Sequence, residues 1–208
     1  MYDLISIGDS TIDVFMEVDL ADTEAICNLD DEKCLIAFGY GAKIPVKKLT
    51  RISAVGNAAN NAIGSARLGL NTALYTVLGS DNDAQEMKKI FEEEEVDTSN
   101  IVMESGKRSN FSVVLNYGAE RTIFVYHEER KYDIPNLPET KWAYFTSVGR
   151  GHEVLHTQIP EYVKKYSVKL GYNPGSHELR EGIDTLKPIL EVTEVLLLNV
   201  EEAHGLVG

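Results

Sequence analysis

A run of small residues and asparagines, GNAANNA at Gly56–Ala62, has the residue types of a binding site for a polar small molecule. It follows an extended segment and opens a helix, so free backbone N–H groups and amide side chains fall at the same place. Gly56 lets a ligand approach the backbone closely, and Asn60 offers a hydroxyl both a donor and an acceptor. The alternative is a helix that Asn57 caps and on which Asn60 is merely solvated.

A carboxylate stands near the start of the chain, where Asp13 follows the apolar segment Leu4–Ile7 by a few residues. In α/β sheets, ligands collect beyond the carboxyl ends of the strands. An ionised carboxylate has several lone pairs and only accepts hydrogen bonds, so it can bind two adjacent hydroxyls of a sugar. On the residue types alone, an aspartate in a turn or cap is the simpler interpretation.

Near the other end of the chain, the sequence LNVEE places Asn199 and Glu202 three positions apart at the end of an apolar run. A carboxylate there can hold Mg²⁺, usually through water, and an amide can meet phosphate oxygens. The same spacing also suits a helix cap, in which the two side chains bond each other's backbone. Both interpretations stay open.

The sequence HEVLH at His152–His156 matches the pattern H-E-x-x-H, in which two histidines one helical turn apart bind zinc and Glu153 is the general base of a hydrolase. Pro160 limits this helix. No third ligand stands out, although two residues are candidates: His177 and Glu178. We therefore expect His152 and His156 to be ordinary helix residues and the chain to hold no stoichiometric zinc.

The elements that must position these residues follow an alternating pattern after Pro138. Strand and helix segments take turns at residues 143–147, 153–166, 168–172, 177–190 and 195–199. Strands that alternate with helices favour βαβ units, and hence a mainly parallel sheet between layers of helices. The sequence therefore predicts an α/β fold.

The first half of the chain mixes such elements with strands that do not fit the alternation. Helices are predicted at 57–68, before Gly69, and after a cap at Ser80 or Asp81, with a strand at 72–78 between them. Residues 19–33 are acidic and irregular and indicate a loop. An exposed strand at 43–55 and a hairpin at 111–126 predict a small β-sheet extension.

Composition excludes several classes of function. The net charge of −13 over 208 residues opposes a nucleic-acid surface, which needs clustered Lys and Arg. No apolar run approaches the roughly 18 residues of a membrane span, and the first residues lack the features of a signal peptide, so we expect a cytoplasmic protein. Cys27 and Cys34 lack the spacing of a zinc or redox pair, and free thiols are expected.

Four motifs occur in order along the chain: IGDSTID at 7–13, GNAANNAIGSARLG at 56–69, RTIFVY at 121–126 and LNVEE at 198–202. In this order they resemble the pfkB family of carbohydrate kinases, the ribokinase-like sugar and nucleoside kinases. The resemblance implies one Rossmann-like ribokinase domain over residues 1–208, with lid strands within about residues 12–55 and 109–127. It also implies ATP-dependent phosphorylation of a sugar or nucleoside hydroxyl, with Mg²⁺ as cofactor.

The resemblance assigns roles to individual residues. Substrate contacts are implied for Asp13, Gly56, Asn57, Asn60 and Phe111. Phe111 would cover the ligand from the lid hairpin, although an aromatic residue there suits strand pairing or a core equally well. Asn199 and Glu202 match the family's motif for phosphate and Mg²⁺, and Asn173 resembles its polar residue at a strand end.

The sequence departs from the family pattern in its pocket and in its catalytic segment. Val55 replaces one glycine of the pocket motif, and Ala58 replaces another frequent one. The family's base and anion hole lie in a Gly-Ala-Gly-Asp segment, which does not occur in the 208 residues. We therefore expect a chain that lacks the C-terminal catalytic segment and is inactive by itself. The alternative is a non-catalytic sugar- or nucleoside-binding or assembly module, and a homodimer through the lid strands fits either function.

Overall fold

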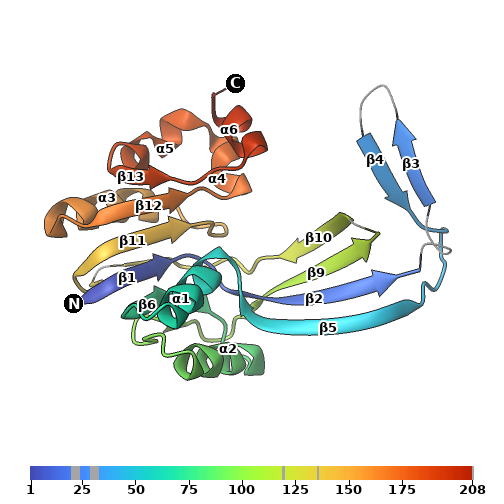
Figure 1. Cartoon of the computed structure of the whole chain (residues 1–208), viewed down its shortest axis with the longest axis horizontal. Coiled ribbons are helices and arrows are strands. Elements are labelled where there is room, and N and C mark those ends of the chain that lie inside the picture. Colours follow the sequence, from blue (N-terminus) through green and yellow to red (C-terminus); the bar gives the residue numbers. More distant parts are fainter. Residues whose placement is uncertain (20–23, 29–32, 119, 135, 208) are drawn as a thin grey trace. The chain divides into compact units, whose positions relative to one another are not determined.

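The computed structural model of the chain describes residues 1–19, 24–28, 33–118, 120–134 and 136–207 (Figure 1). Its contacts divide the chain into two compact units. Unit 1 comprises Met1–Ile12, Ser53–Asn110 and His127–Gly208, and unit 2 comprises Asp13–Ile52 and Phe111–Tyr126. The main chain therefore leaves unit 1 twice to build unit 2, and each unit has its own sheet.

Unit 1 is built on a five-stranded sheet with the strand order β13-β12-β11-β1-β6. Its strands are β1 (Tyr2–Ile7), β6 (Thr72–Tyr75), β11 (Thr140–Thr146), β12 (Lys169–Asn173) and β13 (Thr193–Leu196). Every neighbouring pair is parallel, so the carboxyl ends of these strands lie at one edge of the sheet. The prediction of an α/β fold with a mainly parallel sheet is confirmed.

Six helices are described in unit 1, and the core lies between them and the sheet. They are α1 (Asn57–Arg67), α2 (Asn82–Glu93), α3 (Leu155–Tyr166), α4 (Ser176–Glu181), α5 (Ile183–Leu190) and α6 (Val200–Val207). Helix α1 packs on β1 and β6, and α3 packs on α5. Phe145 and Tyr172 stack their rings 5.2 Å apart inside the core. None of the described helices is long and apolar enough to cross a membrane.

Unit 2 holds a four-stranded sheet with the order β10-β9-β2-β5. Its strands are β2 (Thr11–Val18), β5 (Val46–Val55), β9 (Asn110–Tyr117) and β10 (Glu120–Tyr126). The predicted hairpin is present, because β9 and β10 pair in antiparallel fashion around Gly118, whose φ of 60° suits a tight turn. Most of β5 is exposed, as the charges between its apolar residues predict, and all of β10 is exposed as well.

The interpretation of residues 19–33 as a loop is wrong in part. Strands β3 (Glu24–Asn28) and β4 (Lys33–Ala37) form an antiparallel pair, and the backbone positions of Cys27 and Cys34 are register partners. Cys34 is disulfide-bonded, so the expectation of free thiols fails there. Residues directly opposite on antiparallel strands lie about 4.5–5.5 Å apart, which is within reach of a disulfide. Residues 20–23 and 29–32 of the expected loop lie outside the described residues.

Three predicted elements have different bounds in the structure. The strand expected at 72–78 divides into β6 and β7 (Val77–Leu78), because β7 pairs with β8 (Val102–Met103) rather than with β1. Helix α3 continues through Pro160, whose missing N–H costs one hydrogen bond, while a buried apolar face holds the helix on the core. The helix expected at 177–190 is broken at Gly182, where φ is +87°.

Helix α2 begins at a cap that also fixes a distant loop. Asp81 Oδ1 accepts hydrogen bonds from the Ala84 N–H at 3.0 Å and the Ser109 hydroxyl at 2.6 Å, and Oδ2 accepts one from the Ser109 N–H at 2.8 Å. Burial raises the pKa of Asp81, but these hydrogen bonds outweigh it and the pKa is lowered overall. The ionised carboxylate therefore stabilises the folded state.

The cap predicts a pH-dependent loss of stability. The variant Asp81→Ala should unfold with about 1–2 kcal/mol less free energy at pH 7, the usual loss for a helix cap. Because the folded-state pKa of Asp81 is lowered, its contribution is present above the unfolded value near 4 and lost as the pH falls through the folded value. Urea unfolding of the variant and the parent from pH 7 to pH 3 measures this. A difference that stays constant down to pH 3 would contradict the assigned role.

Candidate functional site

The carboxyl edge of the unit 1 sheet carries a cluster of hydrogen-bonded polar side chains. Asn57 Nδ2, at the start of α1, donates to Asn173 Oδ1 at 3.1 Å and lies 3.4 Å from Thr146 Oγ1. The Thr146 hydroxyl, at the end of β11, donates to the same Asn173 oxygen at 3.3 Å. Asn173, at the end of β12, donates its own amide to the Leu197 carbonyl oxygen at 2.7 Å. The ends of β11 and β12, the residue after β13 and the start of α1 thus present polar groups at one place.

Gly56 brings the start of α1 close to the end of β1. Its φ of +104° is a conformation that residues with a side chain rarely adopt. A Cβ at this position would lie 2.9 Å from the Asp9 carbonyl oxygen, which is too close for a real contact. The motif predicts that a ligand approaches the backbone closely at Gly56, but in the structure the backbone of Asp9 makes this close approach. The glycine thereby lets α1 begin at the edge of the sheet.

The asparagines of α1 point in two directions. Asn57 and Asn60 are exposed and three positions apart, so they share one face of the helix. Asn61 instead accepts a hydrogen bond from the Ser6 hydroxyl of β1 at 2.7 Å. Asn57 and Asn60 are therefore accessible to a ligand, whereas Asn61 attaches the helix to the sheet.

Asp9 is a buried carboxylate to which the sequence interpretation assigned no role. It follows β1 and accepts hydrogen bonds from the Tyr132 hydroxyl at 2.8 Å and from the Gly149 N–H at 2.9 Å. His127 Nδ1 lies 3.1 Å from its Oδ2. Burial, followed by the Asp9 charge, raises the pKa of Tyr132, so the phenol keeps its proton and donates. These bonds fix two loops to the carboxyl edge of the sheet.

The predicted substrate residues Asp13 and Phe111 belong to unit 2. Asp13 lies within strand β2, not in a turn, and Phe111 is half-buried on β9, the neighbouring strand of the sheet. Burial raises the pKa of Asp13, and a hydrogen bond with Ser112 lowers it in part. The two residues therefore lie on adjacent strands of one sheet, while Gly56, Asn57 and Asn60 lie in unit 1.

Asn199 and Glu202 form a reciprocal helix cap, which is one of the two arrangements that their spacing in the sequence allowed. Asn199 Oδ1 accepts the Glu202 N–H at 2.7 Å, and Glu202 Oε2 accepts the Asn199 N–H at 3.0 Å. Asn199 follows Leu197 by two residues, and the Leu197 carbonyl oxygen accepts the side-chain amide of Asn173 at 2.7 Å. The cap therefore begins close to the end of β12 and to the asparagine cluster.

The motif HEVLH does not form the helix that a zinc hydrolase requires. His152 precedes α3, so the expectation of two ordinary helix residues is wrong for it, and both histidines are buried. Glu153 is exposed. Among the described residues, the two histidines form a cluster of potential metal ligands with Glu181 instead of with Glu153. Glu178, one of the two candidates for a third ligand, has its Oε1 3.5 Å from His156 Nε2. The side chain of His177, the other candidate, lies outside the described residues.

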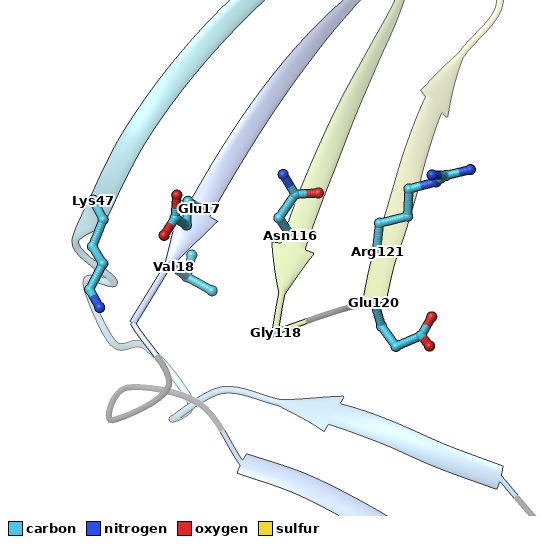
Figure 2. Close-up of a pocket in the computed structure, with 7 residues that line it drawn as sticks. All are labelled: Glu17, Val18, Lys47, Asn116, Gly118, Glu120 and Arg121. Atoms are coloured by element: carbon cyan, nitrogen blue, oxygen red, sulfur yellow. The ribbon is translucent and has the colours of Figure 1, made fainter.

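A separate hollow of about 830 Å³ lies on the unit 2 sheet (Figure 2). Its lining residues come from β2, β5, β9 and β10 and the turn between the last two: Glu17, Val18, Lys47, Asn116, Gly118, Glu120 and Arg121. None of these is a predicted site residue. The charges are of both signs, and Lys47 already pairs with Asp19 at 3.0 Å, so the hollow has the character of a charged surface.

The fold and the polar cluster define an α/β protein with convergent amide, hydroxyl and carboxylate groups at the carboxyl edge of a parallel sheet. The chain belongs to the pfkB family of carbohydrate kinases, because the family model described as "pfkB family carbohydrate kinase" matches residues 23–149. The family membership that the four sequence motifs predict is thus confirmed.

Solved structures confirm the ribokinase-like fold. A putative ribokinase from Agrobacterium tumefaciens is 15% identical with a TM-score of 0.73, and the match covers 100% of this chain and 62% of that one. The ribokinase of Arabidopsis thaliana, complexed with ribose and ATP, is 16% identical with a TM-score of 0.72, covering 100% of this chain and 63% of that one. At these identities the similarity establishes the fold alone.

Two curated relatives are bifunctional proteins. The bifunctional protein HldE of Aliarcobacter butzleri (strain RM4018) is 26% identical over an alignment of 185 residues, and the match covers 80% of this chain and 39% of the relative. A bifunctional ribokinase/ribose-5-phosphate isomerase A of Fructilactobacillus sanfranciscensis is 24% identical over 161 residues, 74% of this chain and 29% of the relative. The chain thus spans well under half the length of either relative.

The close approach at Gly56 predicts a difference between two glycines of the same segment. Gly56→Ala should lower the free energy of unfolding by about 1–3 kcal/mol, because the new Cβ meets the Asp9 carbonyl oxygen at a positive φ. Gly64→Ala is the matched control. Gly64 lies inside α1, and a Cβ added there would meet open space, so this variant should gain up to about 1 kcal/mol in free energy of unfolding. Equal effects of the two variants in urea unfolding would contradict the packing described for Gly56.

Proposed function

We propose that this chain supplies the substrate-binding part of a kinase that transfers phosphate from ATP to a hydroxyl of a sugar or nucleoside. The observation that carries the proposal is the amide and hydroxyl cluster of Asn57, Thr146 and Asn173 at the sheet edge. Such groups bind sugar hydroxyls because each can donate and accept. Family membership and the names of the relatives, among them a ribokinase solved with ribose and ATP, support the same substrate class.

In this proposal two sets of residues hold the substrate. Asn57 and Asn60 offer exposed amides, and Gly56 lets their helix begin at the sheet edge. By the resemblance to the family, Asp13 would accept hydrogen bonds from adjacent hydroxyls, and Phe111 would cover the ligand from the lid strands. The partly buried carboxylate of Asp13 has a raised pKa and gains solvation from hydroxyl donors when substrate binds.

Mg²⁺ and the phosphates of ATP would be held at Asn199 and Glu202. The donor set fits an ion bound through water, because the cap uses one carboxylate oxygen of Glu202 and the side-chain oxygen of Asn199, and not the Asn199 amide N–H groups. The ion would neutralise charge that develops on the transferred phosphoryl group. The chain's own contribution would be to hold this carboxylate in a cap that begins close to the end of β12.

The proposal assigns no catalytic base to these residues. Transfer to a hydroxyl needs a group that accepts its proton and donors that stabilise the migrating phosphoryl group. The predicted residues bind and orient, and the Gly-Ala-Gly-Asp segment that supplies the base in the family does not occur in the 208 residues. Catalysis would therefore depend on a segment with that function, whether joined to the chain or added to it.

A self-association through the lid strands forms part of the proposal. Strand β10 stands at one edge of the unit 2 sheet and exposes four consecutive large side chains: Ile123, Phe124, Val125 and Tyr126. An exposed apolar edge strand favours pairing with a second chain. A homodimer through these strands would cover this surface in either a kinase or a non-catalytic binding module.

The substitution Asp13→Asn tests the substrate site. It should weaken binding of the preferred sugar or nucleoside by about 1.5–3 kcal/mol, or roughly 10- to 150-fold in Kd, because a hydrogen-bond acceptor loses its charge. Calorimetric titration against a panel of sugars and nucleosides measures this, with the exposed Asp184→Asn as the control. Equal affinities of parent and Asp13→Asn would remove Asp13 from the site.

The thermal stability of Asp13→Asn shows whether a loss of binding comes from the site or from unfolding. The pKa of Asp13 is raised in the folded state, so its ionisation disfavours folding as the pH rises through that value. At pH 7 the variant Asp13→Asn should therefore melt at the same temperature as the parent or above it. A marked fall in melting temperature would mean that any loss of binding comes from unfolding rather than from the lost charge.

The missing base predicts the kinetics of the 208-residue chain. It should show no sugar- or nucleoside-dependent ATP turnover by itself, because binding groups alone leave most of the barrier in place. Adding a Gly-Ala-Gly-Asp segment from a relative, fused or as a separate chain, should restore phosphorylation. Turnover by the 208 residues alone at a typical kinase rate of about 1–100 per second would show that another residue acts as base.

A further inference from the structure

Three side chains with metal-ligating atoms converge in unit 1: His152, His156 and Glu181. Their ligating atoms all lie within 4.8 Å of one another. The histidines are 0% and 7% exposed, whereas 25% of the Glu181 side chain is exposed, so the cluster meets solvent on the glutamate side. The residues come from the loop before α3, the first turn of α3 and the end of α4. One ligand among them would join these three segments.

The separations within the cluster are those of groups that share an ion. His152 Nε2 lies 3.4 Å from Glu181 Oε1, which is longer than a charge-assisted hydrogen bond of about 2.7–2.9 Å. Two atoms bound to one tetrahedral zinc ion at about 2.0–2.1 Å lie about 3.3 Å apart. The three ligating atoms lie within 4.8 Å of one another, so one point lies no more than about 2.8 Å from each of them. An ion at that point would need each ligating atom to move by less than about 1 Å to reach the zinc–ligand distance of about 2.0–2.1 Å.

The hydrogen bonds of His152 present the correct nitrogen to an ion. Its Nδ1 lies 2.9 Å from the Gly149 carbonyl oxygen, so Nδ1 carries a proton and donates it. Nε2 then faces Glu181. Zinc-binding histidines have this arrangement, because the second ring nitrogen donates to a carbonyl or carboxylate and fixes the ring. The Gly149 N–H in turn donates to Asp9, which holds the loop in place.

A second carboxylate, Glu178, stands beside His156. Its Oε1 lies 3.5 Å from His156 Nε2 and accepts a hydrogen bond from the Tyr172 hydroxyl at 3.0 Å. Its Oε2 accepts one from the Gly175 N–H at 2.7 Å. Glu178 is completely buried, so these donors fix its position. The cluster thus offers two imidazoles and two carboxylates.

The two imidazole rings lie 4.9 Å apart, and each has a carboxylate oxygen within 3.5 Å of its Nε2. One divalent ion can take ligand atoms from all of these groups. Imidazole and carboxylate ligands together suit Zn²⁺.

We propose that His152, His156 and Glu181, with Glu178 beside them, bind one zinc ion that holds the loop before α3 to the end of α4. This site differs from the H-E-x-x-H arrangement, since Glu153 takes no part in it. It also reverses the expectation from the sequence that the chain holds no stoichiometric zinc. The inference does not depend on the proposed kinase function, and its test involves no substrate.

Metal analysis of the untagged 208-residue chain tests the proposal. The chain is loaded with Zn²⁺ in the presence of excess Mg²⁺, dialysed into metal-free buffer and analysed for metal content. We expect one retained zinc per chain, and, with Co²⁺ in its place, the visible absorption bands of a four-coordinate site. Zn²⁺ should also raise the melting temperature, because a ligand that binds only the folded state stabilises it.

Variants assign the ion to these side chains. His156→Ala should lose the zinc, and Glu181→Gln should weaken zinc binding at least tenfold. Glu181→Gln also serves as the variant most certain to fold, because this side chain is partly exposed. The matched control His204→Ala, at an exposed histidine of α6, should retain one zinc. A parent chain that retains no zinc, or folded His156→Ala and Glu181→Gln variants that retain as much zinc as the parent, would overturn the proposal.

Discussion

The parallel pairing of β1 with β6 and β11 is the constraint on which the rest of unit 1 depends. Because these strands run in the same direction, the residues that follow them meet at one edge of the sheet. Asp9 follows β1 there, and Thr146 ends β11. Every polar group of the candidate site in unit 1 owes its position to this edge. The buried Asp9 carboxylate then fixes two loops that begin or end beside it.

Local signals in the sequence predicted most of the elements, because each depends on near neighbours in the chain. The apolar positions of residues 57–68 predicted a helix whose buried face contains Ala59 and Ala62. The N-x-x-E spacing at Asn199 allowed the cap that the structure contains. The four ordered motifs predicted the family and fold. The roles of Asp13 and Phe111 rest on that resemblance and remain predictions.

The parts that could not be predicted depend on partners far apart in the sequence. Asp9 lies inside a quoted motif, but its partners His127 and Gly149 lie 118 and 140 positions away. Glu181 joins the two histidines only because the fold brings the last residue of α4 to the start of α3, so no spacing rule could find it. Cys34 is a different case, because its register partner Cys27 is only seven positions away, and the prediction failed because the acidic segment between residues 19 and 33 gave no sign of the strand pair β3–β4.

The exposed asparagines at the sheet edge carry the proposed binding of a sugar or nucleoside. The NMR spectrum of the side-chain amides, recorded during titration with ribose and with adenosine, measures this binding. We expect the amide signals of Asn57 and Asn60 to shift with a saturable dependence on one of these ligands, while that of Asn100, in a turn before β8, does not shift. Unchanged signals from Asn57 and Asn60, together with a shift at Asn116 in the hollow of unit 2, would show that the ligand binds elsewhere.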